Sequence, residues 1–407
     1  MLRNDQSVLE LGFSPRLSFE TEGVRYSGSK RSVIPKIHEL IHVLPIRSVL
    51  DAFAGTTRVS QYFKSAGYDV HCNDLAAYST VFGRCYLENC DVERPGLDEK
   101  IKFLNHLKPV DGYFTAHFGG EDDGAGLVKA ADGKKKPFLL KNTRKLDAVR
   151  DEIDKIAEDK IEHAILLTSL INALDQVENT LGHQVAYLFK WAPRAYSDFV
   201  LRRPRLLAGD GSYRVTRMDA RKISDRFDLA YFDPPYNTNN THTPTTRVRY
   251  ASYYHFWTTV VLNDRPQSVG ASNRRLDCSS DTLPGAISKY ESTKYEQVLE
   301  EIDQLIANVD ARYVLFSYSN KGKVGIEDLQ EMFARYKVLA VEKFSHRENV
   351  QKLLTSNREW LGDQSANFEY LFLVEKSLPR SAETHFCVSQ GRGRKIRLRQ
   401  KSQNFQN

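Results

Sequence analysis

The sequence predicts an α/β protein with a doubly wound, mostly parallel sheet that is interrupted by an inserted, mainly helical domain. A short apolar strand at 48–51 runs into a glycine-containing loop and then a helix, the unit that begins such sheets. A second buried-strand pattern at 228–232 ends in Asp233 and two prolines, which must stop the strand. Between these strands, residues 81–209 have mainly helical periodicity, so the sheet is expected to resume after an insert.

The composition is that of a globular protein, with 41% hydrophobic and 27% charged residues in 407. No apolar run approaches the length of a membrane helix, and the first residues lack the apolar core of a signal peptide. The 5 cysteines are scattered and form no CxxC pair, which favours a reducing compartment and argues against structural zinc. We therefore expect a cytoplasmic protein without a metal site or membrane association.

The first predicted elements are a flexible N-terminus, residues 1–20, and a helix between Ile34 and Leu44, where apolar residues recur at helical spacing. Ahead of this helix, residues 25–30 (RYSGSK) form a small polar turn that could receive an anion at the helix start. Considered alone, an ordinary turn before a helix is the favoured interpretation.

The loop 51–57 (DAFAGTT) follows the strand, and Gly55 would let a ligand approach the backbone closely. The loop does not match the GxGxxG pattern of dinucleotide-binding folds. A second strand ends at Asp74, about 20 residues later, the spacing at which a carboxylate can bind ribose hydroxyls. A tight strand-to-helix turn and a helix-capping acid are the structural alternatives.

The insert contains helical patterns at 142–158 and 161–174 and a glycine-rich polar loop at 119–133. Its last part interleaves basic and aromatic side chains, which suits phosphate contacts combined with stacking or wedging at bases. A solvated basic loop is the alternative for each residue taken singly. The candidate nucleic-acid-binding residues are Lys190, Trp191, Arg194, Tyr196, Arg202 and Arg203.

After the insert, short strands are predicted at 213–220, which includes Asp219, at 314–320, and at 367–374 at or near the sheet edge. The polar loop 237–246 has room to close over a substrate. The final 32 residues, from Lys376, hold eight Lys or Arg and one acidic residue. Such a tail can hold a phosphate backbone or can simply be a disordered, solubilising end.

The tetrapeptide Asp233-Pro234-Pro235-Tyr236 is the most informative stretch. The Asp233 carboxylate and the Pro234 carbonyl are two neighbouring acceptors, which suit a group with two N–H donors such as the exocyclic amine of a base. Tyr236 offers a flat face on which a base can stack. A strand end with a Pro-Pro turn and a packed tyrosine is the alternative.

This tetrapeptide resembles the catalytic signature of amino-group DNA methyltransferases, in the form usual for the Dam-like adenine-N6 group. Residues 25–30 resemble the aromatic-x-Gly-x-Lys motif of that group. The loop 51–57 resembles its Asp-x-Phe-x-Gly loop, with Thr57 where many members have a second glycine. The motif order, with the cofactor loop first, the insert next and Asp-Pro-Pro-Tyr last, is similar to the alpha arrangement of these enzymes.

The resemblance implies a Rossmann-like methyltransferase fold that uses S-adenosylmethionine to methylate adenine N6 in double-stranded DNA. It implies a catalytic domain of residues 21–80 and 210–375, a target-recognition insert at 81–209 and a basic tail at 376–407. Its setting would be a restriction-modification system, with a cognate restriction endonuclease as a genetic rather than physical partner. The residues implied are Asp233, Pro234, Pro235 and Tyr236 for catalysis, and Tyr26, Lys30, Phe53, Ala54, Gly55, Asp74, Asp219 and Asp233 for the cofactor.

Three alternatives remain open from the residues. Cytosine-N4 methylation shares the acceptor geometry, although the aspartate of the tetrapeptide argues against it. Methylation of adenine in RNA is a further enzymatic option. A catalytically silent DNA-binding protein is the alternative of another class, against which the intact Asp74, Asp233 and Tyr236 count.

Overall fold

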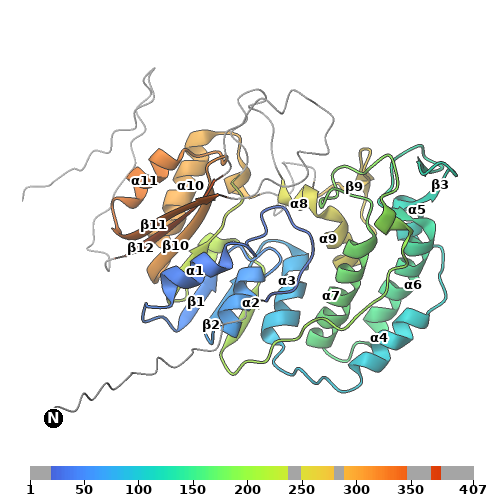
Figure 1. Ribbon diagram of the computed structural model, residues 1–407, viewed down its shortest axis with the longest axis horizontal. Coiled ribbons are helices and arrows are strands. Elements are labelled where there is room, and N and C mark those ends of the chain that lie inside the picture. The colour runs from blue at the N-terminus through green and yellow to red at the C-terminus, as the bar shows by residue number, and fades with distance from the viewer. Residues whose placement is uncertain (1–19, 237–248, 279–287, 346–367, 377–407) are drawn as a thin grey trace, which may run out of the picture.

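The computed structural model describes residues 20–236, 249–278, 288–345 and 368–376. Its central element is a seven-stranded sheet in the order β11-β12-β10-β7-β1-β2-β6 (Figure 1). The strands from β6 to β10 pair in parallel, whereas β12 runs antiparallel to β10 and β11. The predicted doubly wound, mostly parallel sheet is confirmed. The strands are β1 (Ser48–Asp51), β2 (Asp69–Asn73), β6 (Tyr213–Thr216), β7 (Phe227–Phe232), β10 (Ala311–Ser319), β11 (Lys337–Ser345) and β12 (Phe368–Glu375).

The chain changes direction across the sheet between β1 and β7. From β1 it proceeds outward to β2 and β6, and it then returns to β7 beside β1 and continues to β10 on the other side. Ligands of open α/β sheets bind at such a switch point, outside the carboxyl ends of the strands. The loop after β1 and the tetrapeptide after β7 meet at this place.

Helices cover both faces of the sheet. Successive side chains of each strand point to opposite faces, so each strand contributes to two apolar clusters. Val49 and Leu229 belong to one buried apolar cluster, and their neighbours Leu50 and Ala230 belong to another. The first face packs against α1 (Ile34–Ile41), α2 (Arg58–Ser65) and α3 (Ala77–Gly83). The second face packs against α10 (Tyr295–Asn308) and α11 (Ile326–Phe333).

The insert is mainly helical, as its periodicity predicts. Its helices are η1 (Arg84–Glu88), α4 (Leu97–His106), α5 (Tyr113–Phe118), α6 (Leu140–Ile156), α7 (Lys160–Val177) and η2 (Pro193–Tyr196). Helices α4 to α7 gather on the right of Figure 1, away from β10 to β12. Their apolar side chains belong to the same buried cluster as the first face of the sheet. The insert thus shares a continuous core with the sheet.

Two segments of the insert and its surroundings differ from a simple helical body. The glycine-rich loop forms part of a small sheet, in the order β4-β3-β5, built from β3 (Gly119–Asp122), β4 (Val128–Lys129) and β5 (Phe138–Leu139). In addition, α8 (Tyr250–Tyr253), α9 (His255–Leu262) and the hairpin of β8 (Ser268–Val269) and β9 (Arg274–Arg275) follow the tetrapeptide in sequence. Helix α9 nevertheless packs against α7 of the insert. Residues 250–262 therefore connect the sheet, whose strand β7 they follow in sequence, to the insert.

Strand β11 has no counterpart in the sequence predictions. It lies at one edge of the sheet, and its side chains are exposed or half-buried, so it lacks a clear apolar alternation. The strand predicted at 367–374 is β12, which lies one position inside that edge. The loop at 237–246 and the basic tail after residue 376 lie outside the described residues. None of the helices that the structure describes combines the length and apolar character that a membrane crossing requires.

Candidate active site

The loop after β1 is held open by Asp74 at the end of β2. The Gly55 N–H donates to Asp74 Oδ2 at 2.8 Å, and the Ala76 N–H donates to Asp74 Oδ1 at 2.8 Å. Gly55 has φ +51°, in the left-handed region that favours glycine. Each carboxylate oxygen has a second lone pair, so Asp74 can still accept a hydrogen bond from a ligand hydroxyl.

Thr57 stands in this loop where many proteins with the same motif have a second glycine. Its φ is +61°, so a β-branched residue occupies the left-handed backbone conformation that a glycine would adopt easily. Such a conformation costs about 1–2 kcal/mol for a residue with a Cβ. The buried Thr57 hydroxyl donates to the Thr56 carbonyl at 2.7 Å and accepts from Gln61 Nε2 at 3.2 Å. These bonds hold the loop in a glycine-like conformation without the glycine.

Tyr26 packs directly on this loop. Its ring stacks on Tyr254, with centroids 4.4 Å apart, and a Cβ atom added to Gly55 would lie 3.2 Å from it. Tyr254 belongs to the aromatic run at 253–257 that precedes and begins α9. The segment before α1, the β1 loop and the start of α9 thus converge on one ring.

Lys30, from the same segment as Tyr26, lies between two carboxylates. Its Nζ is 2.9 Å from Asp233 Oδ1 and 3.2 Å from Glu369 Oε1. Glu369, on β12, also accepts a hydrogen bond at 2.7 Å from the hydroxyl of Ser317 on β10. Lys30 and Glu369 are buried, whereas Asp233 is partly accessible. Sequence reasoning missed Glu369, for which a single acid inside the apolar strand 368–374 was the available signal.

The electrostatics of this triad of Lys30, Asp233 and Glu369 are unusual. Burial raises the pKa of Asp233 to about 7, with Glu369 adding to the rise and Lys30 opposing it. Burial disfavours the charge on Lys30, but the two carboxylates outweigh that effect and hold its pKa well above the ordinary range. With all three groups ionised the triad carries one net negative charge. Perturbed carboxyl groups of this kind are typical of functional sites.

One cavity brings together the predicted catalytic and cofactor residues other than Asp219. It is lined by Tyr26, Lys30, Phe53, Ala54, Gly55, Asp74, Asp233, Pro234, Pro235 and Tyr236, and also by Asp51. Asp219 is not among its lining residues. Its carboxylate instead binds the Arg221 guanidinium and accepts from the Arg221 N–H at 3.1 Å, at the start of η3 (Ala220–Lys222). The structure therefore gives Asp219 a capping role near, but not in, the cavity wall.

The cavity fits S-adenosylmethionine, which carries a sulfonium, an ammonium group and ribose hydroxyls. Asp51 lines the cavity, and its buried Oδ1 has no hydrogen-bond partner among the residues that the structure describes, while its Oδ2 accepts from Ser60 Oγ at 2.5 Å. Burial raises the pKa of Asp51 to about 7, so a cation beside it would be stabilising. The acidic wall of Asp51, Asp74 and Asp233 suits the two cationic groups of that ligand, and the left-handed backbone at Gly55 allows a close approach.

A family model of the D12 class N6 adenine-specific DNA methyltransferases matches residues 26–314, from Tyr26 through the cavity residues to β10. The chain belongs to this methyltransferase family. The match covers β1, β2, β6, β7, the insert and the first residues of β10, whereas β11 and β12 lie beyond it. It confirms the family resemblance seen in the motifs.

Several curated proteins are similar to this methyltransferase. Modification methylase StsI of Streptococcus sanguinis is 26% identical over 374 residues, which is 87% of this chain and 52% of that protein. Type II methyltransferase M.NlaIII of Neisseria lactamica is 27% identical over 347 residues, covering 83% of this chain and 93% of the relative. M.FokI of Planomicrobium okeanokoites is 24% identical over 379 residues, 87% of this chain and 53% of its own. The chain thus spans about half of StsI and M.FokI but nearly all of M.NlaIII.

Among solved structures, magnesium protoporphyrin IX methyltransferase from Synechocystis, with bound S-adenosylmethionine, aligns at 7% identity. The alignment covers 85% of this chain and 77% of that one, with a TM-score of 0.28. This likeness is too low to support an inference about the present methyltransferase.

Replacing Gly55 with alanine is expected to weaken cofactor binding by the methyltransferase. The new Cβ would meet the Tyr26 ring at 3.2 Å and would sit at a positive φ. Gly67→Ala is the matched control, because Gly67 has φ +85° and no described residue beyond its chain neighbours lies within 4 Å of the added atom. Both variants should lose about 1–2 kcal/mol of stability, because each places a Cβ in the left-handed region, but only Gly55→Ala should raise the dissociation constant for S-adenosylmethionine in calorimetry. Equal affinities would contradict the assigned role of the loop.

Three of the predicted DNA-contacting residues of the methyltransferase are engaged within the protein: Trp191 is buried, and Arg194 and Arg203 are half-buried. Trp191 is only 6% exposed, and its indole N–H donates to the Glu121 carbonyl at 3.1 Å. Arg194 donates to the Glu178 carbonyl at 2.7 Å. Arg203 donates to Asp98 Oδ2 at 2.8 Å. The expectation that Trp191 stacks on bases thus needs correction, because its ring fills the interior of the insert.

The remaining three residues of that prediction face solvent. Lys190, Tyr196 and Arg202 are exposed, although the Tyr196 hydroxyl binds Asp122. Exposure leaves Lys190 and Arg202 able to reach a phosphate, which is what the sequence predicts for them. Two residues before Trp191, the ring of Phe189 is exposed, and the sequence reasoning did not single it out.

Proposed function

We propose that the protein is a site-specific DNA methyltransferase that methylates adenine N6 in duplex DNA with S-adenosylmethionine, as the modification enzyme of a restriction-modification system. The observation that carries the proposal is the position of Asp233 and Tyr236 at the carboxyl end of β7. There they share one cavity with the loop that follows β1. Family membership and the similarity to StsI and M.NlaIII support the setting. A cognate restriction endonuclease would be a genetic partner.

The tetrapeptide would act on the amine of an adenine. The Asp233 carboxylate and the Pro234 carbonyl accept hydrogen bonds from the two N–H groups, which draws electron density onto N6. Tyr236 stacks on the base, and its own ring is supported edge-on by Tyr318, with centroids 5.5 Å apart. Because N6 is hard to reach inside a base stack, the adenine must be flipped out of the duplex.

Positioning does much of the remaining work. Bound S-adenosylmethionine supplies an electrophilic methyl group on a sulfonium. Asp233 and Pro234 aim N6 at that methyl group, and such alignment of two reactants can lower a barrier by several kcal/mol, roughly 7 or more in the best cases. Asp233 must be ionised to accept the hydrogen bond that orients the amine and to stabilise the partial positive charge that develops on N6.

The proposal is tested by incubating the purified protein with methyl-labelled S-adenosylmethionine and mixed-sequence duplex DNA, or RNA of matching sequence. We expect label in duplex DNA only. Label confined to RNA would overturn the substrate assignment. Cofactor binding without transfer to either would favour a DNA-binding protein that is catalytically silent.

The DNA-facing surface of the insert can be refined from the exposed side chains. Phe189 is 69% exposed and Leu127 is 41% exposed, and the Val128 N–H donates to the Phe189 carbonyl at 2.9 Å, so the two apolar residues lie on paired segments. Lys135 Nζ is 3.3 Å from the centroid of the Phe189 ring, and Lys190 is exposed beside it. An apolar pair flanked by two lysines suits a wedge between base steps with phosphates beside it.

Phe189→Ala is expected to lower the rate of methylation about tenfold, because an aromatic stack on a base contributes roughly 1–3 kcal/mol. Placing a mismatch opposite the target adenine should restore the rate, since a weakly paired base costs less to flip. Phe103→Ala is the matched control, because Phe103 on α4 is also exposed, at 48%. A loss in Phe189→Ala that mismatched DNA does not relieve would contradict a wedging role.

A further inference from the structure

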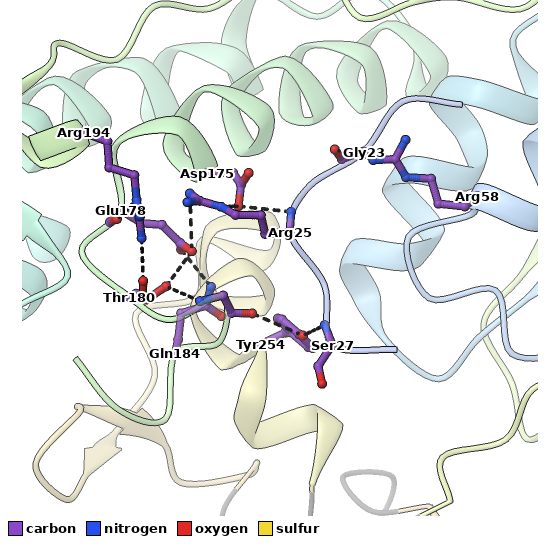
Figure 2. Close-up of polar contacts among 11 residues, drawn as sticks. Gly23, Arg25, Ser27, Arg58, Asp175, Glu178, Thr180, Gln184, Arg194 and Tyr254 are labelled. Atoms are coloured by element: carbon purple, nitrogen blue, oxygen red, sulfur yellow. Dashed lines mark hydrogen bonds and ion pairs between the residues drawn. The ribbon is translucent and has the colours of Figure 1, made fainter. Parts of the chain in front are cut away.

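A polar cluster joins residues 25–30, the segment that carries Tyr26 and Lys30, to the insert (Figure 2). It consists of Arg25, Asp175, Glu178 and Arg194. The Arg25 N–H and its Nε each donate to Asp175 Oδ1 at 3.3 Å, and Arg25 Nη2 lies 3.8 Å from Glu178 Oε1. The Asp175 and Glu178 side chains are 4% and 1% exposed, whereas Arg25 is 40% exposed. Arg25 directly precedes Tyr26, which lines the cofactor cavity.

The two carboxylates are fixed within the insert. Asp175 lies in the last turn of α7, and Glu178 follows its end. Glu178 accepts from Thr180 Oγ1 at 2.6 Å and from Gln184 Nε2 at 3.2 Å. Arg194 donates through Nε to the Glu178 carbonyl at 2.7 Å. The turn after α7 is therefore ordered on its own account and is bonded to the segment that precedes the exposed Tyr196.

A second attachment lies on the other side of Tyr26. The Ser27 N–H donates to the Tyr254 hydroxyl at 2.6 Å, and that hydroxyl donates to the Gly182 carbonyl at 3.4 Å. The chain on either side of Tyr26 is thus tied to residues 175–184 of the insert, once by charge through Arg25 and once through Tyr254, as Figure 2 shows.

We propose that Arg25 is a positioning residue for the cofactor, whose ion pairs with Asp175 and Glu178 fasten the segment carrying Tyr26 and Lys30 to the insert. The inference rests on the proposed function, because the cavity that Tyr26 and Lys30 line is taken to bind S-adenosylmethionine. Arg25 acts through these two residues. The insert therefore shapes the cofactor site as well as the DNA surface.

If Arg25 only balanced charge, restoring that balance would restore cofactor binding as well as stability. The cluster contains two buried carboxylates and two guanidinium groups, so removing Arg25 leaves an excess of buried negative charge and destabilises the fold. Removing Asp175 at the same time restores the balance of charge but not the attachment. The double variant therefore separates charge balance from positioning.

The experiment compares Arg25→Gln, Asp175→Asn, their double variant and Arg25→Lys with the wild type. Arg47→Gln is the control, because Arg47 also pairs with an aspartate, Asp69 at 3.1 Å, but does so at the amino end of β1. The readouts are the thermal midpoint, the dissociation constant for S-adenosylhomocysteine, and KM for S-adenosylmethionine against kcat. Equilibrium binding tests the inference even if no methyl transfer to DNA occurs, so its failure and that of the proposed function are distinguishable.

We expect Arg25→Gln and Asp175→Asn each to raise KM and the dissociation constant about tenfold, a difference of about 1.4 kcal/mol, with kcat within twofold of the wild type. Arg25→Lys should recover part of the loss, because an ammonium keeps the charge but not the forked geometry. The double variant should regain thermal stability yet keep the weakened binding. Wild-type affinity in the double variant, or in a folded Arg25→Gln, would overturn the proposal.

Discussion

Replacing Asp233 with alanine is expected to abolish methyl transfer while leaving DNA and cofactor binding measurable. The variant loses the ionised acceptor that orients N6, and the loss of such a group costs about 10³-fold in rate. The fold should survive, because Glu369 remains 3.2 Å from Lys30 and continues to pair with it. The measurement is single-turnover methylation of duplex DNA, with binding followed separately by calorimetry and gel shift.

Asp225→Ala is the control for this variant. Asp225 precedes the amino end of β7 and pairs with Arg214 at 3.1 Å, so it removes a carboxylate from the opposite end of the same strand. It should methylate DNA at close to the wild-type rate. An active Asp233→Ala enzyme would sink the assignment of the tetrapeptide.

The second large effect is a pair of opposite shifts in pH dependence. Asp233 must be ionised to accept hydrogen bonds, and its pKa of about 7 predicts that kcat/KM rises as pH increases through that value. Lys30→Gln removes the cation that lowers this pKa, so the inflection should move to higher pH. Glu369→Gln removes a negative charge that raises the pKa of Asp233, so the inflection should move to lower pH.

Stability provides an independent check on the same triad. Lys30→Gln leaves the buried Glu369 and the partly accessible Asp233 without their cation and should lower the free energy of unfolding by about 3 kcal/mol. The double variant Lys30→Gln with Glu369→Gln should recover much of this loss. Glu375→Gln is the control, because Glu375 lies on the same strand but pairs with Arg312 and Lys337 away from the cavity. If the pH inflection moved in the same direction in Lys30→Gln and in Glu369→Gln, that result would contradict the electrostatic account.

Much of the site was predictable because it lies in local sequence. The loop 51–57, Asp74 and the tetrapeptide each follow a strand of a parallel sheet, and the carboxyl ends of such strands meet at one edge. The cavity accordingly contains all the predicted catalytic and cofactor residues except Asp219. The Asp219 carboxylate instead pairs with Arg221, two positions along the chain. A motif alone does not indicate whether such a carboxylate binds a neighbouring cation or a ligand.

The features that sequence could not supply depend on tertiary contacts. Glu369 reaches the site only because β12 inserts between β10 and β11, which no local pattern specifies. Trp191 and Phe189 are two residues apart in one aromatic and basic stretch, and only packing decides that the first is buried and the second exposed. The attachment of Arg25 to α7 spans 150 residues of sequence.

The measurement that tests the central claim most directly is nucleoside analysis of duplex DNA after incubation with methyl-labelled S-adenosylmethionine. The account predicts label in N6-methyladenine, at discrete sites that sequencing would reveal. Label in N4-methylcytosine would retain the fold and cofactor but contradict the assignment of the target base. DNA that carries no label, under conditions in which the protein binds the cofactor, would contradict the proposed activity itself.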